Sequence, residues 1–215
     1  MPHYVLDART TQPHFPGIGR YVTNLAANLI PLLAADERLT ILAHPRHLPA
    51  LPNTVLLPVG ASPFSLAQQW QIPRLLRLLR ADLYHSAYVA MPYAPLTPTV
   101  LTIYDLIPLL YPEQSSRRAR GLIGLLNRLA LHAARVVIAI SEATRRDYVR
   151  CLGAPADKIV TIPLAAAFND PQSGGEPPGA RASQPAPRAA RYILYLGSNK
   201  PHKNLVRLVE AFARL

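Results

Sequence analysis

Two spacings of hydrophobic residues alternate along this chain. Short, nearly continuous apolar runs are typical of strands, whereas apolar residues that recur every three or four positions predict helices. The runs that predict strands are Tyr4–Asp7, Leu39–Ala43, Thr54–Leu57, Asp82–His85, Thr99–Tyr104, Arg135–Ile140 and Lys158–Ile162. Helical spacing lies between them, for example from Ile18 to Leu32. This alternation predicts an α/β fold with a doubly wound parallel sheet and helices on both faces.

Residues at the expected ends of these elements refine the picture. Ser65–Arg80 predicts a helix with a break at Pro73, because proline removes a backbone donor and clashes with the preceding turn. Ser141 is placed to cap the helix that follows, and Gly153 to end it. A further helix is expected where apolar residues recur at Leu122, Leu125, Leu126, Leu129 and Ala133.

The segment 170–190 interrupts the pattern. It is rich in proline, glycine, alanine and serine, and almost nothing in it can build a core, so we expect a mobile linker. After it, Tyr192–Leu215 predicts an apolar strand, a short turn and an amphipathic helix whose apolar side chains need partners. The expected organisation is therefore a domain over 1–169, a linker over 170–190, and the incomplete start of a second α/β domain over 191–215.

Charge and composition restrict the function classes. The net charge is +11, and the segment from Arg117 to Arg150 holds eight arginines and only two acids. Such a surface attracts anionic lipid, nucleic acid or phosphorylated substrates, and the favoured alternative is an arginine-rich composition with ordinary solvated helix faces. Nucleic-acid binding is disfavoured, because aromatic residues are few and no zinc-finger or RNP-type motif occurs. A single cysteine, Cys151, and the lack of a signal-peptide core near Met1 favour a cytoplasmic protein, with contact at the inner face of a membrane left open. His44 and His47 have metal-like spacing but no third ligand nearby, and we assign them to a loop.

Six segments occur in a characteristic order: GIGRYV, LYHSAYVAMP, TIYDLIPLLYPE, VVIAISEATRRDYV, KIVTIPLA and YILYLGSNKPHKNLVRLVEAF. Together they resemble the retaining GT-B glycosyltransferases of family four, in a branch of bacterial polysaccharide or lipopolysaccharide mannosyltransferases. The resemblance covers the chain apart from the linker. It implies a Rossmann-like acceptor-side domain over 1–169, the start of a donor-binding domain at 191, and chemistry in the cleft between them.

The resemblance also assigns roles to residues at strand ends. Gly17 and Gly19 open a helix, where free N–H groups and glycine backbone suit close approach to a ligand or a positive φ. A simple tight turn is the alternative. The residues that the resemblance places toward the acceptor are Gly17, Gly19, Arg20, His85, Ser141 and Glu142. For Ser141 the sequence favours a purely structural role as a helix cap.

Tyr104 and Asp105 follow the strand Thr99–Ile103, at the carboxyl end where open α/β sheets bind their ligands. Many relatives have a histidine–aspartate pair here, and this chain has tyrosine at the histidine position. Tyr104 does not titrate near neutral pH but can donate a hydrogen bond. Asp105 is expected to stabilise positive charge on an oxocarbenium-like sugar, unless it only caps the following turn. These two residues are the catalytic candidates.

The donor-phosphate candidates lie after the linker, in the turn that opens the last helix. They are Gly197, Lys200, Lys203 and Asn204. A strand that leads into a turn and a helix N-terminus is an anion site, and lysines add mobile charge. Lys203 matches the lysine that relatives use for the diphosphate, whereas Ser198 or Asn199 replaces their arginine.

The expected activity is transfer of a sugar from a nucleoside diphosphate sugar to a carbohydrate or lipid-linked acceptor, without a metal or other cofactor. The chain ends before the pair of glutamates that relatives use in the donor domain, so we expect this part alone to be inactive. A non-catalytic sugar- or nucleotide-binding half-domain and a GT-B-type nucleotide-sugar epimerase remain alternatives. A dinucleotide-dependent dehydrogenase is disfavoured, because no three-glycine fingerprint follows the first strand.

Overall fold

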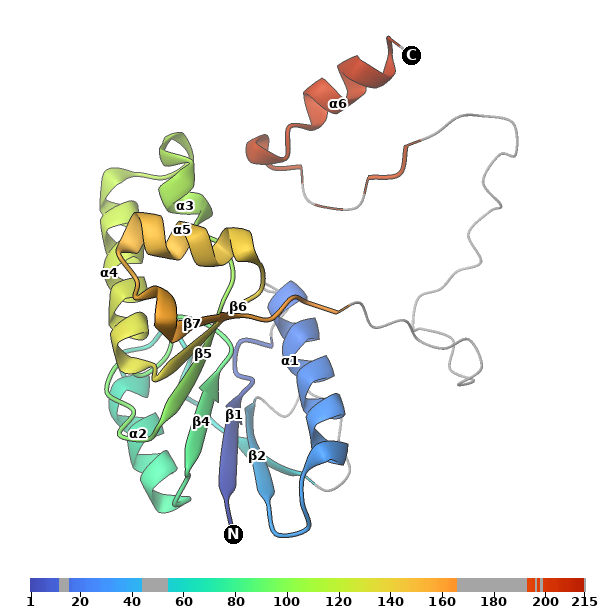
Figure 1. Ribbon diagram of the computed structural model, residues 1–215. Helices are drawn as coiled ribbons and strands as arrows, with labels where there is room; N and C mark the ends of the chain where they lie inside the picture. Colours follow the sequence, from blue (N-terminus) through green and yellow to red (C-terminus); the bar gives the residue numbers. More distant parts are fainter. Residues whose placement is uncertain (12–15, 44–53, 166–192, 196, 198, 215) are drawn as a thin grey trace, which may run out of the picture. The chain divides into compact units, whose positions relative to one another are not determined.

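The computed structural model describes residues 1–11, 16–43, 54–165, 193–195, 197 and 199–214, with the backbone alone at His202. The chain divides into two units, Met1–Ala166 and Ala167–Leu215 (Figure 1). The expected linker 170–190 and the histidines at 44 and 47 lie outside the described residues.

The first unit is built on one parallel sheet with the strand order β3-β2-β1-β4-β5-β6-β7. Its strands are β1 (His3–Asp7), β2 (Arg38–Ala43), β3 (Val55–Pro58), β4 (Leu83–Ser86), β5 (Thr99–Ile103), β6 (Val136–Ala139) and β7 (Ile159–Thr161). Every neighbouring pair is parallel. The doubly wound α/β fold predicted from the sequence is confirmed.

Helices cover both faces of this sheet (Figure 1). On one face α1 (Pro16–Leu29) buries Val22 and Ala26 against β1 and β2. On the other face α2 (Gln68–Leu78), α4 (Arg117–Ala133) and α5 (Glu142–Leu152) contribute to a second core cluster with six strands. Short helical turns complete the unit: η1 (Ile30–Leu32), α3 (Ile107–Leu110), η2 (Pro112–Gln114) and η3 (Ala156–Lys158).

The strand order reverses direction between β1 and β4. From β1 the chain proceeds to β2 and β3 on one side, and from β4 it proceeds to β7 on the other. In open α/β sheets, ligands bind beyond the carboxyl ends of the strands at such a switch point. The carboxyl ends of β1, β4 and β5 therefore define where a site is expected.

The ends of α5 follow the sequence prediction. The Ser141 hydroxyl accepts a hydrogen bond from the Thr144 N–H at 3.1 Å, which satisfies one of the free donors of the first turn. Gly153 ends the helix in the left-handed region with φ 66°, where a side chain would be strained. These two residues fix the length of α5 and with it the start of the loop into β7.

Two sequence predictions about elements are wrong. Pro73 does not break α2, which runs through it with the proline ring buried. The expected strand near the C-terminus is not found in its described part: Ile193–Tyr195 is not in a strand and has no strand partner among the described residues. An isolated extended segment gains no ladder hydrogen bonds, so apolar patterning alone does not make it a strand.

The second unit contains η5 (Pro201–Lys203) and α6 (Leu205–Phe212) among its described residues. The helix expected there is therefore confirmed. In the part of the chain that the structure describes, no helix combines the length and the apolar character needed to cross a bilayer.

Candidate functional site

The carboxyl edge of the sheet brings together most of the residues that the sequence singled out in the first unit. Gly17 opens α1 after β1, Asp105 follows β5, and Ser141 follows β6. Because all strands are parallel, these three positions lie at the same edge of the sheet. The interactions around them show what each side chain is able to do.

A buried ion pair lies at the end of β1, between the last strand residue and the loop that follows. Asp7 and Arg9 have side chains that are 5% and 2% exposed, and Arg9 Nη2 lies 2.6 Å from Asp7 Oδ2. Arg9 Nε also donates to Asp7 Oδ1 at 2.9 Å, which makes the contact bidentate. Burial lowers the pKa of Arg9, but the Asp7 carboxylate outweighs this effect and the pKa is raised overall. Arg9 therefore stays charged at any physiological pH.

Arg9 also connects distant segments of the unit. Its guanidinium donates to the Ala61 carbonyl at 3.1 Å and to Gln68 Oε1 at 3.0 Å. Tyr84, which lies in β4, donates its hydroxyl hydrogen to the Asp7 carboxylate. Burial raises the pKa of Tyr84 well above its usual value. The pair thus joins the end of β1 to β4, to Ala61 and to the first residue of α2.

The N-terminus of α1 presents backbone to solvent. Gly17 is exposed, and a Cβ built on it would meet nothing within 4 Å. Gly19 is buried, and a Cβ there would lie 3.3 Å from the Thr11 side chain, so close packing explains this glycine. Neither glycine has a positive φ, which corrects the conformational reason suggested by the sequence. Arg20 is exposed on the same turn.

A chain of three polar side chains crosses from α1 to β4. Thr102 Oγ1 lies 3.1 Å from Tyr21 Oη and 2.9 Å from His85 Nε2. The single hydroxyl proton of Thr102 serves one neighbour, so this oxygen donates to one of them and accepts from the other. The His85 imidazole is consequently held by Thr102 of β5, which is itself hydrogen-bonded to Tyr21 of α1.

Burial lowers the pKa of His85 to about 4, while the nearby Asp7 carboxylate opposes this shift in part. The folded protein therefore favours neutral imidazole at neutral pH. The unfolded chain takes up a proton near the ordinary pKa of 6.5, so stability is fully present above 6.5 and is lost as the pH falls toward 4.

We expect the titration of His85 to lower the free energy of unfolding by about 2 kcal/mol when the pH falls from 6.5 to about 5. The figure follows from the limiting slope of about 1.4 kcal/mol per pH unit for one proton. The measurement is urea unfolding at both pH values for wild type and His85→Gln, which lacks the titrating group. An equal loss of stability in the two proteins would contradict the prediction.

Tyr104 lies at the same edge with its hydroxyl enclosed. The Tyr104 oxygen is buried and has no hydrogen-bond partner among the described residues. Its ring packs edge-on against Tyr21, with ring centroids 6.0 Å apart. Burial, followed by Tyr21 and Tyr88, raises the pKa of Tyr104. The phenol is therefore a neutral donor without an assigned acceptor in the described part of the chain.

Asp105 is exposed, unlike its neighbour. Its Oδ1 accepts a hydrogen bond from the Ile107 N–H at 3.2 Å, so it does cap the turn into α3. Its charge also contributes to raising the pKa of Tyr88 and of Tyr148. Capping uses one lone pair of the carboxylate, and the exposed position leaves the charge available to a ligand.

Ser141 and Glu142 open α5 next to this group. Ser141 acts as the helix cap described above, so its structural role is confirmed. Glu142 is exposed and lies 3.1 Å from Arg145, and its second oxygen accepts from Thr161 Oγ1 at 2.9 Å. Thr161, followed by Arg145, lowers the pKa of Glu142. Glu142 is therefore a fixed carboxylate at the end of β7.

The donor-phosphate candidates belong to the second unit. Lys200 and Lys203 are exposed and bracket η5, and the Lys203 N–H donates to the Lys200 carbonyl at 2.8 Å. Asn204 adopts φ 55° and precedes α6 without a side-chain cap. A Cβ on Gly197 would lie 2.6 Å from the Tyr195 hydroxyl, so a larger residue there would require the partly exposed Tyr195 side chain to move. These residues form one turn at a helix N-terminus.

Several residues of this edge were not predicted from the sequence. They are Asp7, Arg9, Tyr21, Tyr84 and Thr102. The signal for two of them was present, because Asp7 and Arg9 are charged residues directly after an apolar strand, as Asp105 is. Tyr21, Tyr84 and Thr102 follow ordinary helix or strand patterns, and only the tertiary fold shows that their hydroxyl groups converge. Among the described residues no group of three or more histidine, cysteine, aspartate or glutamate side chains has the arrangement of a metal site.

Fold and site together define an open α/β protein with a polar edge at its topological switch point. The family model Glycosyltransferase Family 4 matches residues 16–166, and the chain belongs to that family. The chain is 30% identical over 143 residues to the O-antigen chain mannosyltransferase B of Escherichia coli, a match that covers 65% of this chain and 36% of that protein. The chain thus matches little more than a third of that relative.

One solved structure of similar fold is the UDP-GlcNAc 2-epimerase of Methanocaldococcus jannaschii. It has a TM-score of 0.44 and 12% identity, and the match covers 74% of this chain and 44% of that chain. A likeness at this level carries no functional argument.

Proposed function

We propose that the protein is a glycosyltransferase that moves a sugar from a nucleoside diphosphate sugar to a carbohydrate or lipid-linked hydroxyl in cell-surface polysaccharide synthesis. The observation that carries the proposal is the family match over residues 16–166, which includes the polar edge around Asp105. The Escherichia coli relative is named a mannosyltransferase, so a nucleoside diphosphate mannose is the first donor to test.

The proposed roles follow from charge and exposure. Asp105 keeps an exposed carboxylate at the strand edge, where it would stabilise positive charge that develops on the transferred sugar. Tyr104 would supply a neutral hydrogen bond in place of the histidine of many relatives. Burial lowers the pKa of His85 to about 4 and raises that of Tyr104, so both values lie far from neutral pH, and general acid or base catalysis by either residue is disfavoured.

Contacts to the substrates are also proposed. Gly17 exposes backbone at the start of α1 and Glu142 offers a fixed carboxylate, and both would face the acceptor. In the second unit Lys200 and Lys203 would neutralise the leaving diphosphate, since ammonium groups serve as mobile point charges for phosphate. We further propose a GT-B-type enzyme that retains anomeric configuration and needs no metal.

The test is sugar transfer by the purified full-length protein, measured with several nucleoside diphosphate sugars and a panel of carbohydrate and lipid-linked acceptors. We expect release of the nucleoside diphosphate that depends on acceptor, and unchanged rates after treatment with a metal chelator. The anomeric configuration of the product, read by NMR, checks retention. Binding of nucleotide-sugar without turnover would instead support a binding module, and inversion at a sugar carbon without transfer would support an epimerase.

A further inference from the structure

Helix α4 carries large apolar side chains on its solvent-exposed face, whereas most of its buried residues are small or polar. The residues it buries against the sheet and α5 are Gly124, Asn127, Ala130 and Leu131. The leucines that predicted the helix lie on the other side: Leu122, Leu125 and Leu129 are 56%, 52% and 38% exposed. They recur at three- and four-residue intervals and therefore form one ridge along the helix. Such a ridge normally has something to cover it.

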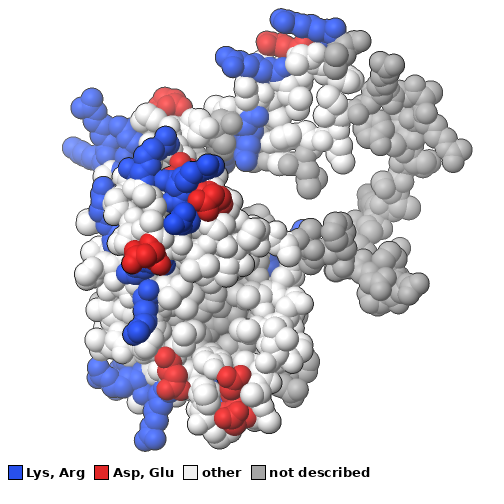
Figure 2. Space-filling model, in the orientation of Figure 1, with Lys and Arg blue, Asp and Glu red and all other residues white. Residues whose placement is uncertain are grey.

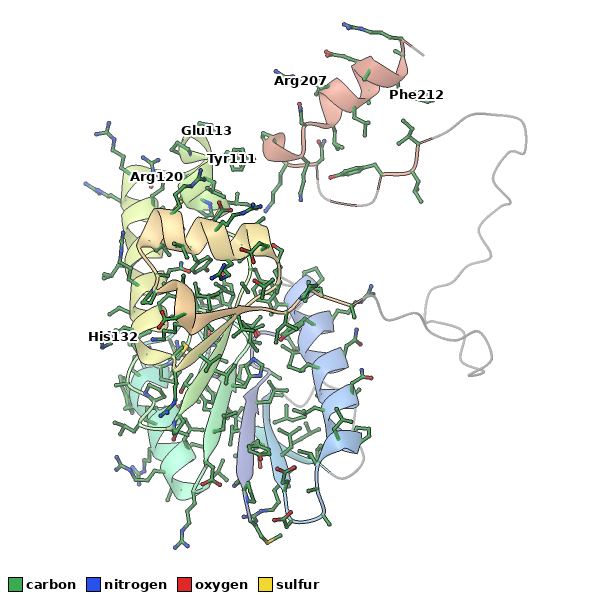
Figure 3. All side chains as sticks on the ribbon, in the orientation of Figure 1. Tyr111, Glu113, Arg120, His132, Arg207 and Phe212 are labelled. Carbon is green, nitrogen blue, oxygen red and sulfur yellow. The ribbon has the colours of Figure 1, made fainter. Side chains whose placement is uncertain are left out.

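The same helix is strongly basic. Its sequence RRARGLIGLLNRLALHA holds four arginines and no acid. Arg120 is committed to the chain, since it donates to the carbonyls of Pro112 at 2.7 Å and Ser115 at 2.6 Å. Arg117, Arg118 and Arg128 are exposed, and none of them forms an ion pair with another described residue. Figure 3 shows the two ends of this helix, with Arg120 at one and His132 at the other.

The helical positions place these arginines beside the leucines. At 100° per residue, Arg118 lies on the line of the ridge one turn before Leu122, and Arg128 lies along the flank of Leu125. Basic side chains are also gathered over the α4 and α5 region in the space-filling view (Figure 2). An apolar ridge with arginines beside it and no acid on the helix is complementary to a surface that is negatively charged outside and apolar beneath.

We propose that α4 is a membrane-docking helix that lays Leu122, Leu125 and Leu129 into a bilayer surface rich in anionic phospholipid. Its exposed arginines would contact the lipid phosphates, while the helix stays parallel to the membrane plane. A protein at the inner face of a bacterial-type membrane meets such a surface, because cytoplasmic leaflets carry anionic lipid. The proposal concerns only the first unit and does not depend on the transferase activity.

A second copy of the chain fits this face less well. An isologous contact through α4 would bring the exposed arginines of two copies together with no acid from either helix, and like charges that meet in an interface oppose association. Three partly exposed leucines also offer little area beside the roughly 800 Å² per partner of a standard interface. Anionic lipid satisfies both the arginines and the leucines.

The experiment is flotation of the full-length protein with vesicles of phosphatidylcholine alone and with vesicles that also contain phosphatidylglycerol. We expect binding to the anionic vesicles only, and weaker binding at high salt because exposed charges are screened. Arg118→Ser and Arg128→Ser should each weaken binding about fivefold, which corresponds to about 1 kcal/mol per arginine. Replacing Leu122, Leu125 and Leu129 together by serine should reduce it at least tenfold.

Matched controls come from the other end of the sheet. Leu32→Ser and Arg38→Ser remove one exposed leucine and one exposed arginine away from α4, and both should leave flotation unchanged. The melting temperature of each variant and sedimentation of each free protein complete the test. The proposal is overturned if the protein does not bind anionic vesicles, or if the control variants weaken binding as much as the α4 variants do. It is also overturned if the wild type forms dimers that the triple leucine variant does not form, and neither protein binds vesicles. A large loss of stability in that variant without vesicle binding would place the ridge in a protein core and would overturn the proposal as well.

Discussion

Replacing Arg9 by methionine should lower the free energy of unfolding by about 3–5 kcal/mol, because it leaves the Asp7 carboxylate buried without its partner. Methionine has a similar length and fills the space of the aliphatic stem. The hydrogen bonds from Arg9 to Ala61 and Gln68 are lost as well. Urea unfolding of the wild type and the variant under the same conditions measures the difference.

A surface pair provides the matched control. Arg150 lies 3.4 Å from Asp147, and its side chain is 73% exposed. Arg150→Met should change stability by less than about 1 kcal/mol, as solvent screens exposed pairs. Adding Asp7→Asn to Arg9→Met should recover part of the loss, because the remaining buried charge is removed. A cost for Arg9→Met as small as that for Arg150→Met would mean that water reaches the Asp7 pair.

The sheet could be predicted from the sequence because each strand carries a local signal. Buried parallel strands read as apolar runs, and Arg135–Ile140 is such a run, with β6 at its centre. Caps are equally local, since Ser141 and Gly153 act on backbone groups a few residues away. That Asp105 and Ser141 lie at the same edge of the sheet follows from these elements and the parallel direction of the strands.

The direction in which α4 faces could not be predicted in this way. The strongest apolar periodicity marks the ridge of Leu122, Leu125 and Leu129, yet the buried side consists of Gly124, Asn127, Ala130 and Leu131. Ala130 and Leu131 join the core cluster, and Asn127 accepts a hydrogen bond from the Tyr148 hydroxyl of α5 at 2.7 Å. Periodicity indicates that a helix is amphipathic, but it does not say whether protein or another apolar phase covers the face.

The Asp7–Arg9 network was missed for a related reason. Its members are far apart in sequence, and Gln68 and Tyr84 reach Arg9 and Asp7 only once the strands are ordered. Local sequence shows two charges after a strand but not that both become buried. Their burial links β1 and β4 to Ala61 and to the first residue of α2.

Asp105→Asn should reduce kcat for sugar transfer by about 10²–10³-fold, if the carboxylate stabilises positive charge in the transition state as proposed. The asparagine oxygen can still accept the hydrogen bond from the Ile107 N–H, so the turn into α3 is preserved. The melting temperature should stay within error of the wild type. Steady-state kinetics of the full-length protein, with donor and acceptor varied separately, give the measurement.

Two further variants separate charge from structure. Asp105→Ala also removes the hydrogen bond that caps the turn. It should therefore lower kcat by the same factor as Asp105→Asn and also lower the free energy of unfolding by about 1 kcal/mol. Glu142→Gln neutralises another exposed carboxylate at the start of α5, and it should raise KM for the acceptor while kcat changes much less. If Asp105→Asn is fully active and only Asp105→Ala is impaired, then Asp105 is a turn residue, and the charge that assists transfer has to come from another group at this edge of the sheet.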